Sequence, residues 1–88
     1  MNIKIDKLTD EEVNNKGVLS WPIWECDVSE FDWEYDQKES CLLLEGKVEV
    51  KSECETVRFS TGDFVVFPKG LKCHWKVTSP VKKHYTFN

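Results

Sequence analysis

Residues 62–73 read GDFVVFPKGLKC, the segment most informative about the architecture of this chain. The apolar run at residues 64–67 predicts a short β-strand, because Val and Phe favour strands and turn residues bound the run on both sides. Gly62 belongs to the turn before the strand, and Pro68 with Gly70 forms the turn after it. These residues follow the spacing G-x5-P-x-G-x2, and Cys73 fills the next position.

Most of the rest of the chain repeats this pattern, in which turn residues separate short runs rich in β-branched and aromatic residues. The runs predict strands near residues 2–5, 21–26, 32–35, 39–45, 47–52, 55–60, 64–67, 73–77 and 82–87. Gly46 stands between two of the runs and predicts a tight hairpin there. Many short strands at regular spacing are typical of a β-sandwich or a β-barrel.

One short helix is expected near the N-terminus. Thr9 and Glu12 have the spacing of a capping box, in which each side chain accepts a hydrogen bond from the other residue's backbone N–H. Gly17 can close the helix at its other end. The segment is short and mostly polar, so we expect it on the surface.

Composition indicates one ordinary globular domain. The chain has 88 residues, of which 40% are hydrophobic and 32% charged. The chain has no apolar run long enough to span a membrane, and no apolar signal region follows Met1. We therefore expect a cytoplasmic protein. The four cysteines form no C-x-x-C pair, which argues against a structural zinc site and, without a secretion signal, against disulfides.

The charges are unevenly distributed along the chain. The net charge is −4, all sixteen acidic residues lie at or before Asp63, and five lysines follow it. Either the strands interleave and mix the charges, or the C-terminal half forms a basic face for an anionic ligand. The acidic total and the lack of a basic cluster argue against nucleic-acid binding.

Two segments together resemble the conserved motifs of the cupin family. The first is WEYDQKE at residues 33–39, followed by Gly46, and the second is the stretch at residues 62–73. The runs SWPIW (20–24), LEGKV (44–48) and KHY (83–85) are similar to a small single-domain branch related to ureidoglycine aminohydrolase. The resemblance implies an all-β cupin domain over residues 1–88. Residues 1–19 would form the N-terminal strand and short helix, and residues 20–88 a jelly-roll barrel, the double-stranded β-helix.

The resemblance also places a site whose usual metal ligands are missing. Metal-binding cupins supply two His and one Glu from the first motif and one His from the second. This chain has Trp33, Tyr35, Glu39 and Cys73 at those positions. An indole N–H can only donate, and two firm ligands are fewer than a zinc site needs. We therefore predict no cofactor, and Zn or another divalent metal only through Glu39, Cys73 and His84.

Strand alternation predicts what lines the barrel interior. Alternate residues share a face, so an inward Glu39 brings Cys41 inward, and an inward Cys73 brings Trp75 with it. A ligand pocket is therefore expected from seven residues: Trp33, Tyr35, Glu39, Cys41, Cys73, Trp75 and His84. We expect Trp21 and Trp24 to serve either in packing or at a subunit contact. The core is expected to hold five phenylalanines: Phe31, Phe59, Phe64, Phe67 and Phe87.

Glu39, Cys73 and Tyr35 are the candidate catalytic residues. Cys73 is either a neutral thiol that fills space or a nucleophile, which would need a nearby base or positive charge. An inward Glu39 is costly unless it is paired, so it either belongs to a structural network or transfers protons and anchors a ligand.

Three functions remain open from the sequence. The first is a binding module for a small polar metabolite in the barrel pocket. The second is a metal-independent or weakly metal-dependent hydrolase or lyase acting on ureido or amide metabolites, as the resemblance implies. The third is a structural or dimerisation barrel without a ligand. A homodimer is expected, because an exposed N-terminal strand would suit pairing between copies.

Overall fold

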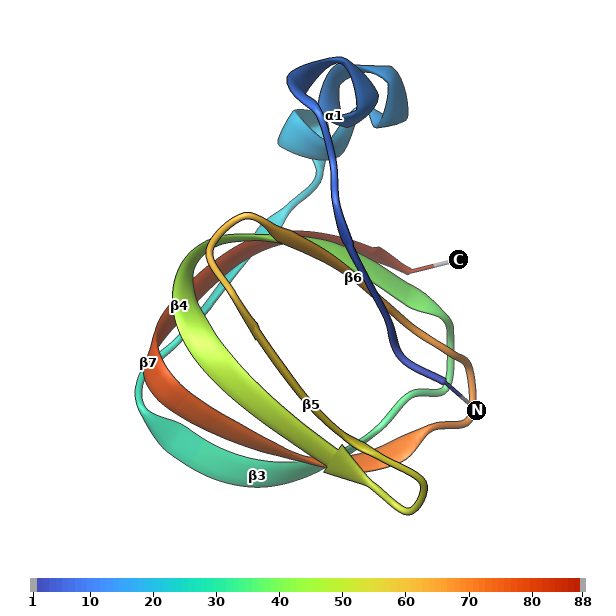
Figure 1. The fold of residues 1–88 in the computed structure, drawn as a ribbon, viewed down its shortest axis with the longest axis vertical. Coiled ribbons are helices and arrows are strands. Elements are labelled where there is room, and N and C mark those ends of the chain that lie inside the picture. Colours follow the sequence, from blue (N-terminus) through green and yellow to red (C-terminus); the bar gives the residue numbers. More distant parts are fainter. Residues whose placement is uncertain (1, 88) are drawn as a thin grey trace.

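The computed structural model describes residues 2–87, in which a strongly curved antiparallel sheet wraps around into a barrel (Figure 1). The strands follow the order β1-β6-β4-β7-β2, with β3 paired to β7 and β5 paired to β4. The elements are β1 (Lys4–Lys7), α1 (Asp10–Lys16), the 3-10 turn η1 (Val18–Ser20), β2 (Ile23–Cys26), β3 (Ser29–Glu34), β4 (Glu39–Ser52), β5 (Thr56–Ser60), β6 (Asp63–Phe67) and β7 (Lys72–Phe87). This architecture confirms the predicted all-β fold with one short helix.

The predicted helix is α1, and its ends are those that the sequence indicates. The Glu12 backbone N–H donates to Thr9 Oγ1 at 3.2 Å, and the Thr9 N–H donates to Glu12 Oε1 at 3.1 Å. Gly17 ends the helix in the left-handed conformation. The helix stands outside the barrel in Figure 1. Val18, which follows it, is fully buried with Leu42 and Phe64 in a small cluster separate from the main core.

Two strands are longer than the sequence predicts. Residues 39–45 and 47–52 form one continuous strand, β4, so the hairpin predicted at Gly46 is wrong. Likewise, the runs at 73–77 and 82–87 join in β7, which pairs with β4 along most of its length. The register between β4 and β7 shifts around Gly46, as it does at a β-bulge. The bulge changes the inward face of β4 from odd to even positions, since Cys41 and Leu43 are buried before it and Val48 and Val50 after it.

Gly46 is required at the bulge by both conformation and space. Its φ is 108°, and a Cβ there would lie 2.5 Å from the backbone oxygen of Pro80. We expect Gly46→Ala to lower the free energy of unfolding by about 2–4 kcal/mol, because backbone strain and overpacking add. Gly62→Ala is the control, since Gly62 also has a positive φ but would meet no backbone atom. Urea denaturation measures both, and equal losses would contradict a steric role for Gly46.

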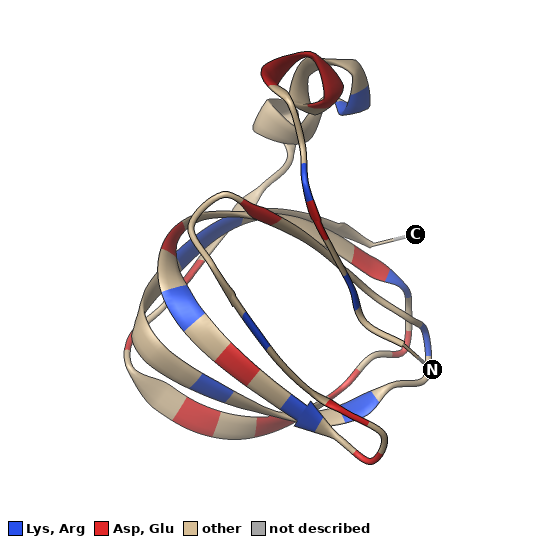
Figure 2. Ribbon diagram, viewed as in Figure 1, with Lys and Arg blue, Asp and Glu red and all other residues tan. Residues whose placement is uncertain are grey.

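The acidic and basic residues mix on the barrel surface, as the interleaving prediction expects (Figure 2). Lysines of β7 lie opposite acids of three neighbouring strands. Lys72 is opposite Glu34, Lys76 is opposite Glu30 and Glu49, and Lys82 is opposite Glu25 and Glu45. The alternative of a single basic face is therefore not what the fold produces.

Aromatic side chains fill the centre of the barrel. Trp75 is buried and stacks on Phe31, with ring centroids 5.9 Å apart. Its ring centroid also lies 5.6 Å from that of Phe67 and 5.7 Å from that of Phe59. Among residues 2–87, no helix has the length and apolar composition needed to cross a bilayer.

Candidate functional site

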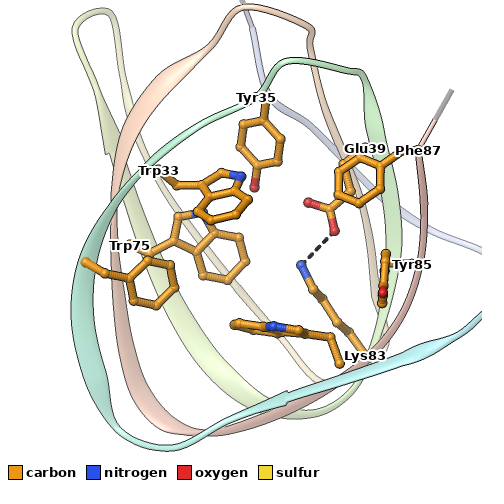
Figure 3. A pocket seen from close by; sticks show the side chains of 9 residues that line it. Trp33, Tyr35, Glu39, Trp75, Lys83, Tyr85 and Phe87 are labelled. Atoms are coloured by element: carbon orange, nitrogen blue, oxygen red, sulfur yellow. Dashed lines mark hydrogen bonds and ion pairs between the residues drawn. The ribbon is translucent and has the colours of Figure 1, made fainter.

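A cavity of about 270 Å³ opens at one end of the barrel, beside the central tryptophan (Figure 3). Seven of its nine lining side chains are aromatic, and the other two carry opposite charges. The lining residues are Trp24, Phe31, Trp33, Tyr35, Glu39, Trp75, Lys83, Tyr85 and Phe87. Trp33 and Phe87 are also exposed, with 48% and 42% of their surface accessible to solvent. The cavity therefore has mostly aromatic walls and one charged locus.

That locus is a buried ion pair between Glu39 and Lys83. Lys83 Nζ donates to Glu39 Oε2 at 2.8 Å, and the two side chains are 6% and 4% exposed. The dashed line in Figure 3 marks this contact between β4 and β7. Removing two charges from water costs several kcal/mol per ion, which their attraction and further contacts must offset.

Two indole rings supply further contacts for the ammonium group. Lys83 Nζ lies 4.8 Å from the ring centroid of Trp24 and 4.7 Å from that of Trp75. A cation above an aromatic face is attracted to the ring electrons, by about 2 kcal/mol when water is excluded. The side chain of Lys83 is thus held by one carboxylate and two aromatic faces.

Alternation along β7 explains why Lys83 points inward. Phe87, Tyr85 and Lys83 lie opposite Glu39, Cys41 and Leu43 of β4. These positions share one face of β7, and residues between them face outward. Lys83 is not among the pocket residues predicted from the sequence. Continuing the alternation from Phe87, which was expected in the core, would have found both Tyr85 and Lys83.

Tyr35 supplies a neutral hydroxyl at the cavity wall. Its ring stacks on Phe67, with centroids 4.8 Å apart, and the residue is 1% exposed. Burial raises the pKa of the Tyr35 hydroxyl well above its usual range, and the negative charge of Glu39 raises it further. The hydroxyl therefore stays protonated and able to donate a hydrogen bond.

Two polar atoms near the ion pair have no hydrogen-bond partner among residues 2–87. One is Oε1 of Glu39, since Lys83 bonds only to Oε2. The other is Nε1 of Trp75, which is buried. A buried indole N–H is normally satisfied, so Nε1 of Trp75 has unused hydrogen-bonding capacity, and the second oxygen of Glu39 can also accept a hydrogen bond.

The structure brings together four of the seven residues expected in the pocket: Trp33, Tyr35, Glu39 and Trp75. Cys41 is fully buried in the core and does not line the cavity. Cys73 Sγ donates to the Trp33 carbonyl at 3.7 Å and borders a separate shallow groove. His84 faces away from the cavity and donates from Nδ1 to the Trp21 carbonyl at 2.8 Å. Alternation explains His84, because its neighbours Lys83 and Tyr85 face inward.

Trp24, Phe31 and Phe87 line the cavity rather than only packing in the core or at a subunit contact. Their place follows from strand pairing. Trp24 of β2 lies opposite Lys83, and Phe31 of β3 lies opposite Trp75. Sequence spacing alone does not indicate which of several aromatic residues reach the same end of the barrel.

The side chains present do not fit the metal ion that many cupins bind. Glu39 is paired with an ammonium group, and Cys73 and His84 lie outside the cavity. No group of three or more His, Cys, Asp or Glu side chains suited to a metal ion occurs within the described part of the chain. A zinc site needs three or four such ligands. His74 also faces outward, where its two ring nitrogens contact Asp32 and Glu30 on the surface.

The two buried thiols near the site are held neutral. Burial raises the pKa of Cys73 to about 11 and that of Cys41 to about 12. The negative charge of Glu39 raises the pKa of Cys73 further, whereas at Cys41 the positive charge of Lys83 opposes the rise more strongly than Glu39 adds to it. A protonated thiol is a poor nucleophile, so the pKa values support the space-filling role of Cys73.

We expect iodoacetamide at neutral pH to alkylate the exposed Cys54 well before Cys73 or Cys41. Stability should fall with rising alkalinity, because unfolded thiols ionise near pH ~8.5 while the folded ones stay protonated. That contribution to stability is complete below about pH 8.5 and is lost as pH rises toward about 11 for Cys73 and about 12 for Cys41. Peptide mass spectrometry after timed alkylation measures reactivity, and fast modification of Cys73 at neutral pH would refute a neutral thiol.

Comparisons with known proteins agree with this architecture. A family model described as "EutQ-like cupin domain" matches residues 13–85. A DUF861 family protein from Thermotoga maritima is 52% identical, with a TM-score of 0.97; the match covers 99% of this chain and 100% of that one. A DUF861 family protein from Pseudomonas syringae is 28% identical over 75% of this chain and 29% of that one, with a TM-score of 0.68.

A putative ethanolamine utilization protein Q from Salmonella typhimurium shares the fold. It is 22% identical, with a TM-score of 0.68, over 99% of this chain and 69% of that one. No curated protein matches this chain.

Proposed function

Since this chain belongs to the EutQ-like cupin domain family, we propose that it binds a small, uncharged polar metabolite in its barrel cavity. The observation that carries the proposal is the Glu39–Lys83 ion pair inside an aromatic-walled cavity. Small-ligand sites are typically concave and apolar with a few well-placed polar groups. The cavity lies just below the usual range of about 300–1,000 Å³, which favours a small ligand.

The charges of the pair favour an uncharged ligand. Glu39 and Lys83 neutralise each other, so an added carboxylate or ammonium would remain unpaired or would have to break the pair. An unpaired charge at a buried site is strongly unfavourable. A neutral amide or ureido group avoids that cost. Its carbonyl can accept from Lys83 Nζ while its N–H donates to the free Oε1 of Glu39.

Calorimetric titration with benzamide, benzoate and benzylamine tests the proposal, because these probes share a ring and differ in charge. We expect saturable binding of benzamide and much weaker binding of the other two. Lys83→Met should abolish benzamide binding, whereas the control Lys82→Met should retain it, because Lys82 faces outward beside Lys83. Benzoate binding as tightly as benzamide would refute the charge argument, and no benzamide binding would favour a structural barrel without a ligand.

A second candidate is a metal-independent hydrolase or lyase acting on ureido or amide metabolites, related to ureidoglycine aminohydrolase. The short contact between Glu39 and Lys83 favours it, because a carboxylate beside an ammonium can take a proton from water and return one to a leaving group. Turnover of such a substrate should then fall on the order of 100-fold in Glu39→Gln. If Glu39→Gln turned the substrate over as fast as the unaltered protein, Glu39 would have no role in proton transfer.

We also propose a cytoplasmic homodimer. The four cysteines are free, as expected in a reducing compartment. Strand β1 lies at the sheet edge with all four residues exposed, which leaves one edge for a second copy. Analytical ultracentrifugation tests the dimer. Twice the chain mass of 10.3 kDa would support it, and a monomer at all concentrations would contradict it.

A further inference from the structure

Lys83 has a chemical capacity that ligand binding alone does not use. It is a primary amine in an apolar cavity, 5% exposed, and its only hydrogen-bond partner among the described residues is Glu39. Lysines that form covalent bonds to carbonyl compounds are typically desolvated amines of this kind. By contrast, Lys76 and Lys82 of the same strand, β7, lie on its outward face.

We propose that Lys83 condenses reversibly with a small aldehyde or ketone in the cavity, giving an iminium ion and water. This inference rests on the proposed function to the extent that the cavity must admit a small uncharged ligand. It adds a covalent step and a substrate class, carbonyl compounds without an ionised group.

Glu39 can move every proton that the condensation requires. The Lys83 ammonium first gives a proton to the carboxylate, 2.8 Å away, and the amine lone pair forms the C–N bond. The carbonyl π electrons move to oxygen, which takes the proton from Glu39. Glu39 then removes a second proton from nitrogen and returns it to the hydroxyl, which leaves as water. The product is an iminium beside an ionised Glu39, and no oxidant or reductant is consumed.

The surroundings of Lys83 suit the product as well as the starting state. An ammonium and an iminium carry the same charge at the same nitrogen. The faces of Trp24 and Trp75 and the carboxylate of Glu39 therefore stabilise both species. Because the charge in the buried site is unchanged, the condensation brings no net desolvation penalty for a new ion.

The cavity walls define the carbonyl compound further. Aromatic side chains line the cavity, with Phe31 and Tyr85 among them, so an apolar or planar body fits. An aldehyde that carries a carboxylate would place a second negative charge beside Glu39. Benzaldehyde is therefore a suitable probe, and glyoxylate is the charged comparison.

Reductive trapping tests the inference on the whole protein. The protein is incubated with limiting benzaldehyde and cyanoborohydride, which reduces an iminium to a stable benzyl-lysine, and labelled peptides are quantified by mass spectrometry. We expect Lys83 to be labelled faster than Lys82, and on the order of 100-fold more slowly in Glu39→Gln, since Glu39 moves the protons. Glyoxylate should label Lys83 no faster than Lys82.

Benzamide supplies a second measurement that needs no substitution. In the unaltered protein it should protect Lys83 from benzaldehyde and leave the labelling of Lys82 unchanged. Labelling of Lys83 at the same rate as Lys82 would overturn the covalent inference. If benzamide nevertheless binds in calorimetry, the proposed ligand-binding function stands without the covalent reaction. If benzamide does not bind and Lys83 is not labelled preferentially, both the binding function and the covalent reaction are refuted.

Discussion

Lys83→Met should lower the free energy of unfolding by about 3–5 kcal/mol, because it leaves Glu39 buried without its partner. An isolated carboxylate in an apolar cavity keeps the desolvation cost and loses the attraction that offsets it. Urea denaturation of the two proteins measures the loss. Lys82→Met is the matched control and should change stability little, since its ammonium group is on the outer face.

The double variant Glu39→Gln/Lys83→Met distinguishes the interaction between the two side chains from the separate contribution of each to stability. Removing both charges avoids the unpaired ion, so we expect the double variant to be more stable than Lys83→Met alone. A double variant that loses the sum of the two single losses would show that Glu39 and Lys83 act independently. That result would contradict the ion pair as the polar centre of the cavity.

Trp75→Ala should lower the free energy of unfolding by about 3–5 kcal/mol, the usual cost of removing a large buried aromatic side chain. Trp75 is 2% exposed and packs against Phe31, Phe59 and Phe67, so the space left behind cannot easily collapse. The substitution also removes one of the two indole faces over Lys83.

Trp33→Ala is the control for Trp75→Ala, because Trp33 lines the same cavity but is 48% exposed. It should cost clearly less stability, since much of its surface is in water in both states. Thermal and urea unfolding of the two variants check this order. A larger loss for Trp33→Ala would contradict the placement of Trp75 at the centre of the core.

The sequence predicts the barrel well because local signals decide its elements. The capping box at Thr9 and the strand at residues 64–67 depend on neighbouring residues only, and the structure has both. Gly46 misled the prediction because a glycine with positive φ suits a hairpin turn and a β-bulge alike. Only the long pairing of β4 with β7 distinguishes the two.

The polar centre of the site was harder to predict than its walls. Glu39 was recognised as a buried acid that needs a partner, but Lys83 lies 44 residues away along the chain. A lysine in a strand is normally solvated, so its burial depends on a carboxylate that only the closed barrel brings near. Cys73 and His84 fell outside the cavity for geometric reasons that the motif spacing does not contain.

The most direct test of ligand binding in the cavity uses the four tryptophans as internal reporters. Trp24, Trp33 and Trp75 line the cavity, whereas Trp21 packs outside it against Phe64. A titration of ¹⁵N-labelled protein with benzamide follows each indole N–H signal separately. Binding in the cavity predicts saturable shifts of the Trp24 and Trp75 signals with Trp21 unchanged. No saturable shift, or a shift confined to Trp21, would contradict it.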